Sequence, residues 1–108
     1  MPRAFQVLWM GTAEADLRSI AADLARESPA AAAGALDLIE EKASGLARFP
    51  ERGRVVPELS AHAVLAYREL VIAPWRVVYR VEARRVLVLA VLDARRNLED
   101  LLLDRFLR

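Results

Sequence analysis

The chain has 108 residues and a formal net charge of +1, with 56% hydrophobic and 29% charged residues. This length is typical of one domain, so we expect residues 1–108 to form a single domain around one core. The high apolar fraction excludes intrinsic disorder. The chain has no cysteine and a single histidine, His62, which excludes disulfides and thiolate zinc sites. Because a glycine-rich phosphate loop is also absent, we expect neither a metal nor a cofactor.

The sequence gives no sign of a membrane segment. The longest apolar run, Val86 to Leu92, is much shorter than the roughly 18 residues that a membrane span requires. The segment from Met1 to Phe5 lacks the apolar core of a signal peptide. We therefore expect a cytoplasmic protein with no membrane partner.

The first half of the chain predicts a strand followed by two helices. Residues 5–10 are apolar and predict the strand. Thr12 is expected to cap the first helix. Ser28 followed by Pro29 marks the start of the second, which should run to about Arg48. Apolar residues recur with helical spacing in both helices: Leu17, Ile20, Ala21 and Leu24, then Ala32, Leu36, Ile39, Ala43 and Leu46.

The second half changes to the periodicity of strands. Residues 51–65 contain glycine and proline and show no period, so we expect a surface connection there. Residues 67–72 predict a strand, and residues 75–82 predict another with one apolar and one more polar face. Residues 86–92 are apolar without alternation, which is typical of a central strand covered on both faces.

A last helix is expected over residues 98–107. Asn97, with Asp100 three residues later, resembles a capping box at its start. The predicted order is therefore β-α-α-β-β-β-α, an α+β fold in which a helical hairpin packs on a small mixed sheet.

Positive charge is concentrated in the second half of the chain. Between residues 52 and 96, nine arginines stand against four acidic residues. Such an excess suggests an anionic partner, either nucleic acid or an acidic protein. Fifteen of the sixteen basic residues are arginine, with Lys42 alone, and a GC-rich genome would explain that preference without any specific site.

The candidate site consists of polar residues on the predicted sheet and at its edges. Its members are Arg54, Arg68, Glu69, Arg76, Arg80, Arg95 and Arg96. Arginine forks suit phosphate oxygens. Cleavage of RNA without a metal would also need a base and an acid. Glu69 and Tyr79 are the nearby candidates for proton transfer, and strand alternation places Glu69 on the face opposite Arg68.

A second interpretation of these residues is purely structural. In it, the arginines form ion pairs around the sheet with the acidic residues of the same region. Those acidic residues are Glu58, Glu69, Glu82 and Asp93. The sequence leaves both interpretations open, because spacing alone does not show which charges meet.

Several short segments together resemble the RelE/ParE toxins of type II toxin–antitoxin modules. The resemblance lies in Tyr67–Leu70, Trp75–Val81 and Val91–Asn97, and it continues through the first half of the chain. The matching segments there are Ala15–Leu17 with Ile20, Ser28–Ala31, Leu46–Pro50, Gly53–Arg54 and Glu58–Leu59. The similarity rests on the order of weak motifs over nearly the whole chain. It implies the fold of the family, two helices packed on a twisted antiparallel β-sheet.

The resemblance implies one of two mechanisms. RelE-like members are ribosome-dependent endoribonucleases that cut mRNA, whereas ParE-like members inhibit DNA gyrase. Arg76 matches the arginine of the ribonuclease motif Tyr-Arg-x-x-Tyr, with Trp75 in place of tyrosine. Arg95 matches the arginine after the last strand, and Arg68 stands where RelE-like enzymes often have lysine. If the chain is a nuclease, Arg68, Arg76 and Arg95 are its expected catalytic residues.

Other positions depart from the ribonuclease pattern. Leu70 stands where a second lysine would lie, and Asp93 where many relatives have histidine. The tyrosine or histidine expected soon after Arg95 is also missing. The resemblance thus favours a ParE-like toxin, of the kind linked to plasmid stabilisation, that inhibits DNA gyrase and arrests growth. An mRNA endoribonuclease acting on the ribosome and an inactive toxin-fold binding protein remain the alternatives.

The resemblance also implies a cognate antitoxin, whose C-terminal segment wraps the toxin in a hetero-oligomer. The predicted last helix fits such a partner, because its apolar residues are too many for one core-facing stripe. Docking of that helix on the sheet, or a homodimer, would explain them equally well. The expected binding residues are Arg54, Arg80, Arg96, Leu98, Leu101, Leu102 and Phe106.

Overall fold

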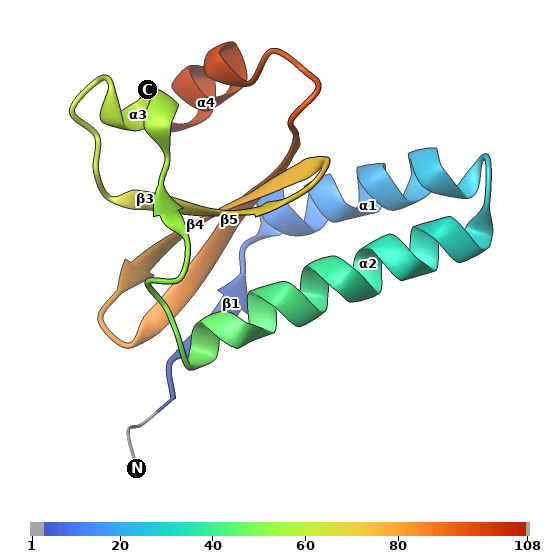
Figure 1. The fold of residues 1–108 in the computed structure, drawn as a ribbon, viewed down its shortest axis with the longest axis horizontal. Coiled ribbons are helices and arrows are strands. Elements are labelled where there is room, and N and C mark those ends of the chain that lie inside the picture. Colours follow the sequence, from blue (N-terminus) through green and yellow to red (C-terminus); the bar gives the residue numbers. More distant parts are fainter. Residues whose placement is uncertain (1–3, 108) are drawn as a thin grey trace.

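The computed structural model describes residues 4–107. One five-stranded sheet has helices on both faces (Figure 1). The long helices α1 (Gly11–Ala25) and α2 (Pro29–Ser44) pack on one face, and the shorter α3 (Pro57–Ser60) and α4 (Leu98–Phe106) pack on the other. Among the described residues, no helix is long and apolar enough to cross a membrane.

The sheet is mixed, as the residue pattern predicts. Its strands follow the spatial order β1-β5-β4-β3-β2. The last four strands of the chain pair antiparallel, as the resemblance implies, and the first lies parallel to β5. The strands are β1 (Gln6–Trp9), β2 (Arg54–Val55), β3 (Tyr67–Ile72), β4 (Trp75–Glu82) and β5 (Arg85–Asp93). The prediction that β5 is an interior strand covered on both faces is confirmed.

The side-chain alternation of β4 divides the core into two layers. Val77 faces the layer under α1 and α2, together with Ile39. Val78 faces the layer under α3 and α4, together with Leu102. All four side chains are fully buried, so each face of the sheet has its own apolar core.

A β-bulge in β5 explains an error in the predicted start of α1. Val78 pairs with Ala90 and Tyr79 with Val88, which leaves Leu89 as the extra residue. The Thr12 hydroxyl donates to the carbonyl of Leu89 at 2.8 Å. The predicted Thr12 cap is therefore wrong, because this hydroxyl is engaged with β5, and α1 begins at Gly11 without a side-chain cap.

The other predicted helix starts are confirmed. The Ser28 hydroxyl accepts a hydrogen bond from the Ala31 amide at 3.1 Å. The Asn97 side chain accepts from the Asp100 amide at 3.5 Å and donates to the Asp100 carboxylate at 2.8 Å. The second helix ends earlier than expected, since a short 3₁₀ helix, η1 (Gly45–Ala47), follows α2.

The segment 51–65 is not the plain surface connection that its lack of period predicts. It forms β2 and α3, and it contributes Val56 and Leu59, both fully buried, to the core. Elements of two and four residues are shorter than the window in which periodicity can be recognised. The prediction was wrong for this physical reason.

Candidate functional site

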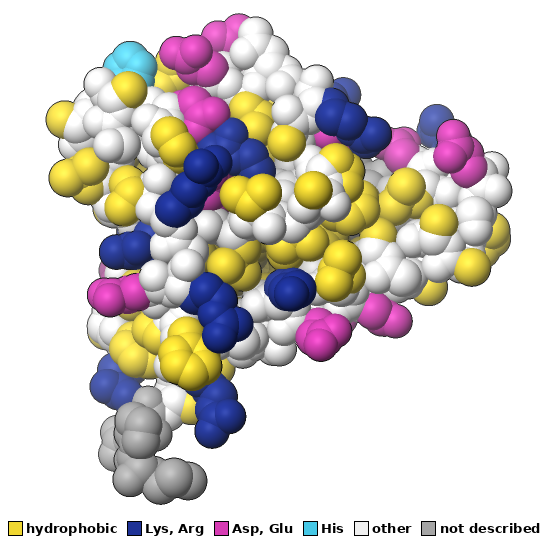
Figure 2. Space-filling model, viewed as in Figure 1, with side chains coloured by type: hydrophobic (Ala, Val, Ile, Leu, Met, Phe, Trp, Pro, Cys, Tyr) yellow, Lys and Arg dark blue, Asp and Glu magenta, His cyan; other side chains and the backbone are white. Residues whose placement is uncertain are grey.

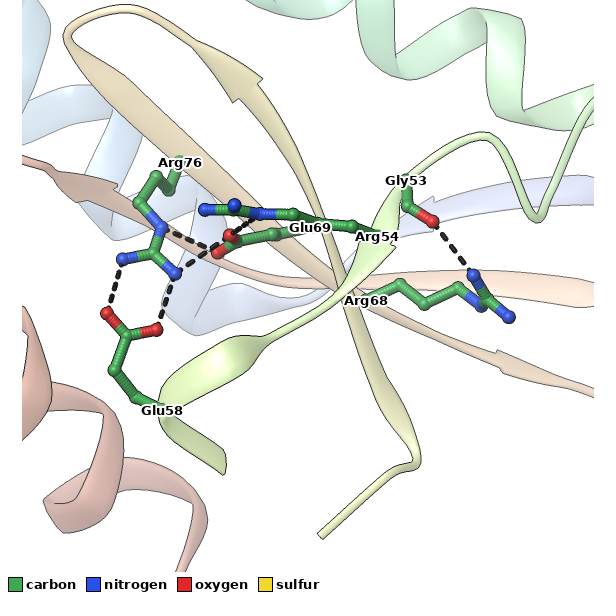
Figure 3. A network of polar contacts seen from close by, with 6 residues as sticks. All are labelled: Gly53, Arg54, Glu58, Arg68, Glu69 and Arg76. Carbon is green, nitrogen blue, oxygen red and sulfur yellow. Dashed lines mark hydrogen bonds and ion pairs between the residues drawn. The ribbon is translucent and has the colours of Figure 1, made fainter. Parts of the chain in front are cut away.

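Four alternating charges form a continuous network on the face of the sheet that carries α3 (Figure 3). In order of contact they are Arg54, Glu69, Arg76 and Glu58, and we call this set the arginine network. Arg76 donates to both carboxylate oxygens of Glu69, at 2.6 and 2.8 Å, and to both of Glu58, at 2.7 Å each. Arg54 donates from Nε to the Glu69 carboxylate at 2.7 Å.

The strand register brings these side chains together. Arg54 of β2 pairs with Glu69 of β3, which pairs in turn with Val78 of β4. Arg76 lies two residues before Val78 and so shares its face of the sheet. The short helix α3 then presents Glu58 from above. The network therefore ties two strands and a helix to the central strand β4.

Burial strengthens the electrostatic interactions between the charges of this network. The Glu69 side chain has no exposed surface and that of Arg76 is 9% exposed. The hydrogen bonds from Arg76 lower the pKa of Glu58 against the opposing effect of burial. Hydrogen bonds to Glu58, and also to Glu69, raise the pKa of Arg76. Arg76 is thus a fixed cation with two carboxylates already bound, so it has no free fork for a phosphate and cannot act as a general acid at neutral pH.

Arg68 lies on the opposite face of the sheet and points away from Arg76 (Figure 3). Its Nη1 donates to the Gly53 carbonyl at 2.8 Å, and the Tyr79 hydroxyl accepts from the Gly53 amide at 2.9 Å. Burial raises the pKa of Tyr79, which makes this phenol a poor general base at neutral pH. As strand alternation predicts, Glu69 and Arg68 stand on different faces.

Gly53 is required where the chain passes over Tyr79. A Cβ atom at this position would lie 2.5 Å from the Glu69 carbonyl oxygen and 2.6 Å from the Tyr79 hydroxyl. Since real Cβ atoms do not approach other atoms so closely, a larger residue would displace the segment that leads into β2. Gly53 thus allows the chain to pass close to the Tyr79 side chain.

The third expected nuclease residue, Arg95, follows the end of β5 and is paired. Its Nε and Nη2 donate to the Asp93 carboxylate at 3.0 and 2.7 Å. These hydrogen bonds lower the pKa of Asp93 to about 2. The Arg95 side chain is 73% exposed, unlike that of Arg76. The structure therefore places Arg68, Arg76 and Arg95 in three different settings and does not assemble them around one phosphate.

The structural interpretation is confirmed for Arg54, Arg76, Arg80 and Arg95, whereas Arg68 binds the Gly53 carbonyl instead of an acidic residue. Each of the four acidic residues that it names is bound to an arginine: Glu58 and Glu69 to Arg76, Glu82 to Arg80, and Asp93 to Arg95. Among residues 4–107, no group of three or more acidic or histidine side chains could hold a metal ion.

The expected binding residues on α4 divide into two groups. Leu98 and Leu102 are buried in the core against the sheet. Their assignment to a binding surface is therefore corrected, because they have no surface to offer while α4 is docked. Leu101 and Phe106 are half-buried, and the Phe106 ring lies 4.7 Å from that of Tyr67, centroid to centroid.

The expected binding arginines are also in different settings. Arg54 and Arg80 already pair with carboxylates. Arg96 lines a cleft of about 260 Å³ between α1 and α4, together with Asp16 and Asp93. Whether these residues bind a partner stays a prediction.

One contact that the sequence analysis missed fixes α4 in place. Arg105 donates from both Nη atoms to the Asp16 carboxylate, at 2.9 and 2.8 Å. Asp16 also accepts from the Val91 amide of β5 at 2.9 Å. The two charges are 89 residues apart, so no local spacing could have paired them.

Comparisons with solved structures place the fold among toxin–antitoxin proteins. A structure described as the chromosomal ParDE system of P. aeruginosa matches with a TM-score of 0.71 and 22% identity, over 85% of this chain and 98% of that chain. A chain of the RelBE2 toxin–antitoxin complex of Mycobacterium tuberculosis matches with a TM-score of 0.58 and 22% identity, over 83% and 98%. A search of curated protein sequences gives no match.

A family model makes the relationship specific. The model described as the ParE toxin of the type II toxin–antitoxin system parDE matches residues 7–98. That span includes the helical hairpin, the arginine network and all of the strands, apart from Gln6, the first residue of β1. The chain belongs to the ParE toxin family, within the RelE/ParE superfamily of type II toxins.

Proposed function

We infer that this chain is a toxin that inhibits DNA gyrase, arrests growth and leaves mRNA intact. One observation carries the inference: Arg76, which matches the ribonuclease motif, is buried and bound by two carboxylates. A phosphate would have to displace Glu58 or Glu69 from it, at the cost of a buried unpaired charge. The membership of the ParE family, rather than of the RelE branch alone, supports the same conclusion.

We also propose a cognate antitoxin as the partner that neutralises this chain in the cytoplasm. Both similar structures are described as toxin–antitoxin systems or complexes. The half-buried residues of α4, Leu101 and Phe106, and the exposed Leu107 are available to such a partner without unfolding the core.

Induced expression without an antitoxin tests the proposal. Growth, mRNA integrity and plasmid supercoiling are followed together in the same cells. We expect growth arrest and loss of supercoiling with intact mRNA. Cleaved mRNA would instead favour the ribosome-dependent nuclease, and normal growth would favour an inactive binding protein.

Matched variants make the test sharper. Arg95→Ala removes an exposed side chain, so it should fold and should leave toxicity unchanged. Phe106→Ala alters the surface of α4, and we expect it to reduce toxicity. The opposite ranking in a growth assay, with folding of both variants checked by circular dichroism, would contradict a gyrase-binding mechanism that uses the C-terminal helix.

A further inference from the structure

Several arginines gather at the end of the molecule where β1 begins. The Phe5 amide donates to the Ala47 carbonyl at 2.8 Å, and the Gln6 amide donates to the Arg84 carbonyl at 3.0 Å. These bonds bring together the start of β1, the end of η1 and the turn between β4 and β5 (Figure 1). We call this region the open end. It is formed by Phe5, residues 48–52 and residues 83–85.

An arginine guanidinium lies over each of two aromatic rings at the open end. The guanidinium of Arg52 lies 4.8 Å from the ring centroid of Phe49, and that of Arg84 lies 4.7 Å from the centroid of Phe5. Phe49 is 55% exposed. A shallow hollow of about 530 Å³ adjoins both rings, and its lining includes Arg48. Figure 2 shows hydrophobic and cationic side chains interspersed on this part of the surface.

Three of the arginines at the open end have no ion-pair partner in the part of the chain that the structure describes. Among residues 4–107, Arg48, Arg52 and Arg85 take part in no ion pair. The lining of the hollow contains one acidic residue, Glu51. The open end therefore attracts anions, whereas the arginine network is internally neutral.

We propose that the open end binds a single strand of nucleic acid, with a base stacked on the exposed ring of Phe49 and phosphates held by Arg48 and Arg52. An acidic peptide would be attracted by the cations but would leave the exposed ring of Phe49 without a matching group. Bases offer a flat π-face and phosphates offer paired oxygens, which is the combination that rings flanked by arginines recognise. A duplex hides the faces of its bases, so the exposed ring favours a single strand.

This surface is separate from the arginine network and goes beyond the proposed function. Binding is measured on the purified full-length chain by fluorescence anisotropy, with labelled oligo-dT and oligo-U of about 12 nucleotides. Detectable binding to either strand supports the proposal, and the tighter of the two identifies the sugar that is preferred. Binding to a polyglutamate peptide as tight as to both strands would overturn it in favour of an acidic protein partner.

Variants test the two roles separately. We expect Phe49→Ala to weaken binding roughly 5- to 100-fold, as is usual for the loss of one stacking ring, and Phe49→Trp to retain it. Arg48→Ala combined with Arg52→Ala should reduce the slope of log affinity against log salt by about 1.4, since each phosphate contact to a single strand contributes about 0.7.

A charge-matched control excludes a general effect of net charge. Arg18 on α1 and Arg26, which directly follows α1, have side chains that are 72% and 81% exposed. Their double substitution by alanine removes the same charge far from the rings and should leave the salt slope unchanged. An equal loss in both double variants, or no loss in Phe49→Ala, would overturn the proposal while leaving the proposed toxin activity untouched.

Discussion

The arginine network and the open end use the same residue type in opposite ways. In the network, Arg76 is buried, and its positive charge is matched by the carboxylates of Glu58 and Glu69. At the open end, Arg48 and Arg52 are exposed and take part in no ion pair among the described residues. The comparison teaches that a count of arginines does not locate a binding site. Whether an arginine is available to a ligand depends on whether an acidic side chain already pairs with it.

The two regions should therefore respond to mutation in opposite ways. A charge removed from the network leaves a buried partner without compensation, so the fold loses stability. A charge removed from the open end changes only a solvated surface, so stability is preserved and ligand binding changes. The following experiments test this difference, in order of decreasing effect.

Arg76→Ala should give the largest change. It leaves Glu58 unpaired and leaves the fully buried Glu69 with Arg54 alone. We expect the free energy of unfolding to fall by about 3–5 kcal/mol, as measured by urea denaturation. Arg48→Ala is the matched control and should stay within about 0.5 kcal/mol of the parent chain. Equal effects of the two substitutions would remove the distinction between the regions.

Gly53→Ala should be the next most harmful change, because it pushes a methyl group against Glu69 and Tyr79 beneath the network. We expect a loss of about 1–3 kcal/mol in the free energy of unfolding. Gly34→Ala is the control, since nothing lies within 4 Å of its Cβ position in α2. This control should stabilise the chain by about 0.5–1 kcal/mol. Thermal denaturation of both variants would reveal any departure from these opposite signs.

Arg105→Ala should have an intermediate effect, because the Arg105 side chain is 33% exposed and that of its partner Asp16 is 14% exposed. We expect a cost of about 1–2 kcal/mol, between the values for exposed and for buried ion pairs. Amide hydrogen exchange should accelerate in α4 more than in β4. Uniform acceleration over the whole chain would instead indicate that this contact does not act locally on α4.

The smallest effect concerns pH. The pKa of Glu58 is lowered from its usual value of 4.5 by the hydrogen bonds of Arg76. The folded state thus binds the proton less tightly than the unfolded state, so Glu58 stabilises the fold above pH 4.5 and loses that contribution as the pH falls through its folded pKa. Glu58→Gln should flatten the pH dependence of urea unfolding in this acidic range. An unchanged profile would show that the ion pair does not contribute.

Local signals predicted much of the fold, and they failed where distant residues decide. Ser28 and Asn97 cap helices because their partners lie within three residues. Thr12 has the same local signature, yet its hydroxyl binds Leu89 of β5. That bond depends on a bulge, which no pattern near Thr12 can reveal.

The candidate site was predictable in part for the same reason. Strand alternation correctly separates Arg68 from Glu69, and the acidic residues present among the arginines correctly suggest ion pairs. Alternation could not show that Glu58 reaches Arg76, because this requires the short helix α3 in a segment without period. It also could not show that Leu98 and Leu102 are the core-facing residues of an apolar helix.

The bulge in β5 has a further consequence for the edge of the sheet. Beyond the end of β1, the hydroxyl of Thr12 and the carboxylate of Asp16 occupy the carbonyl of Leu89 and the amide of Val91. At the opposite margin of the sheet, β2 has only two residues. The part of β5 that extends beyond β1 thus has two of its backbone groups already bonded and unavailable to a new strand. Side chains of α1 therefore take the place that a longer β1 would have along this part of β5.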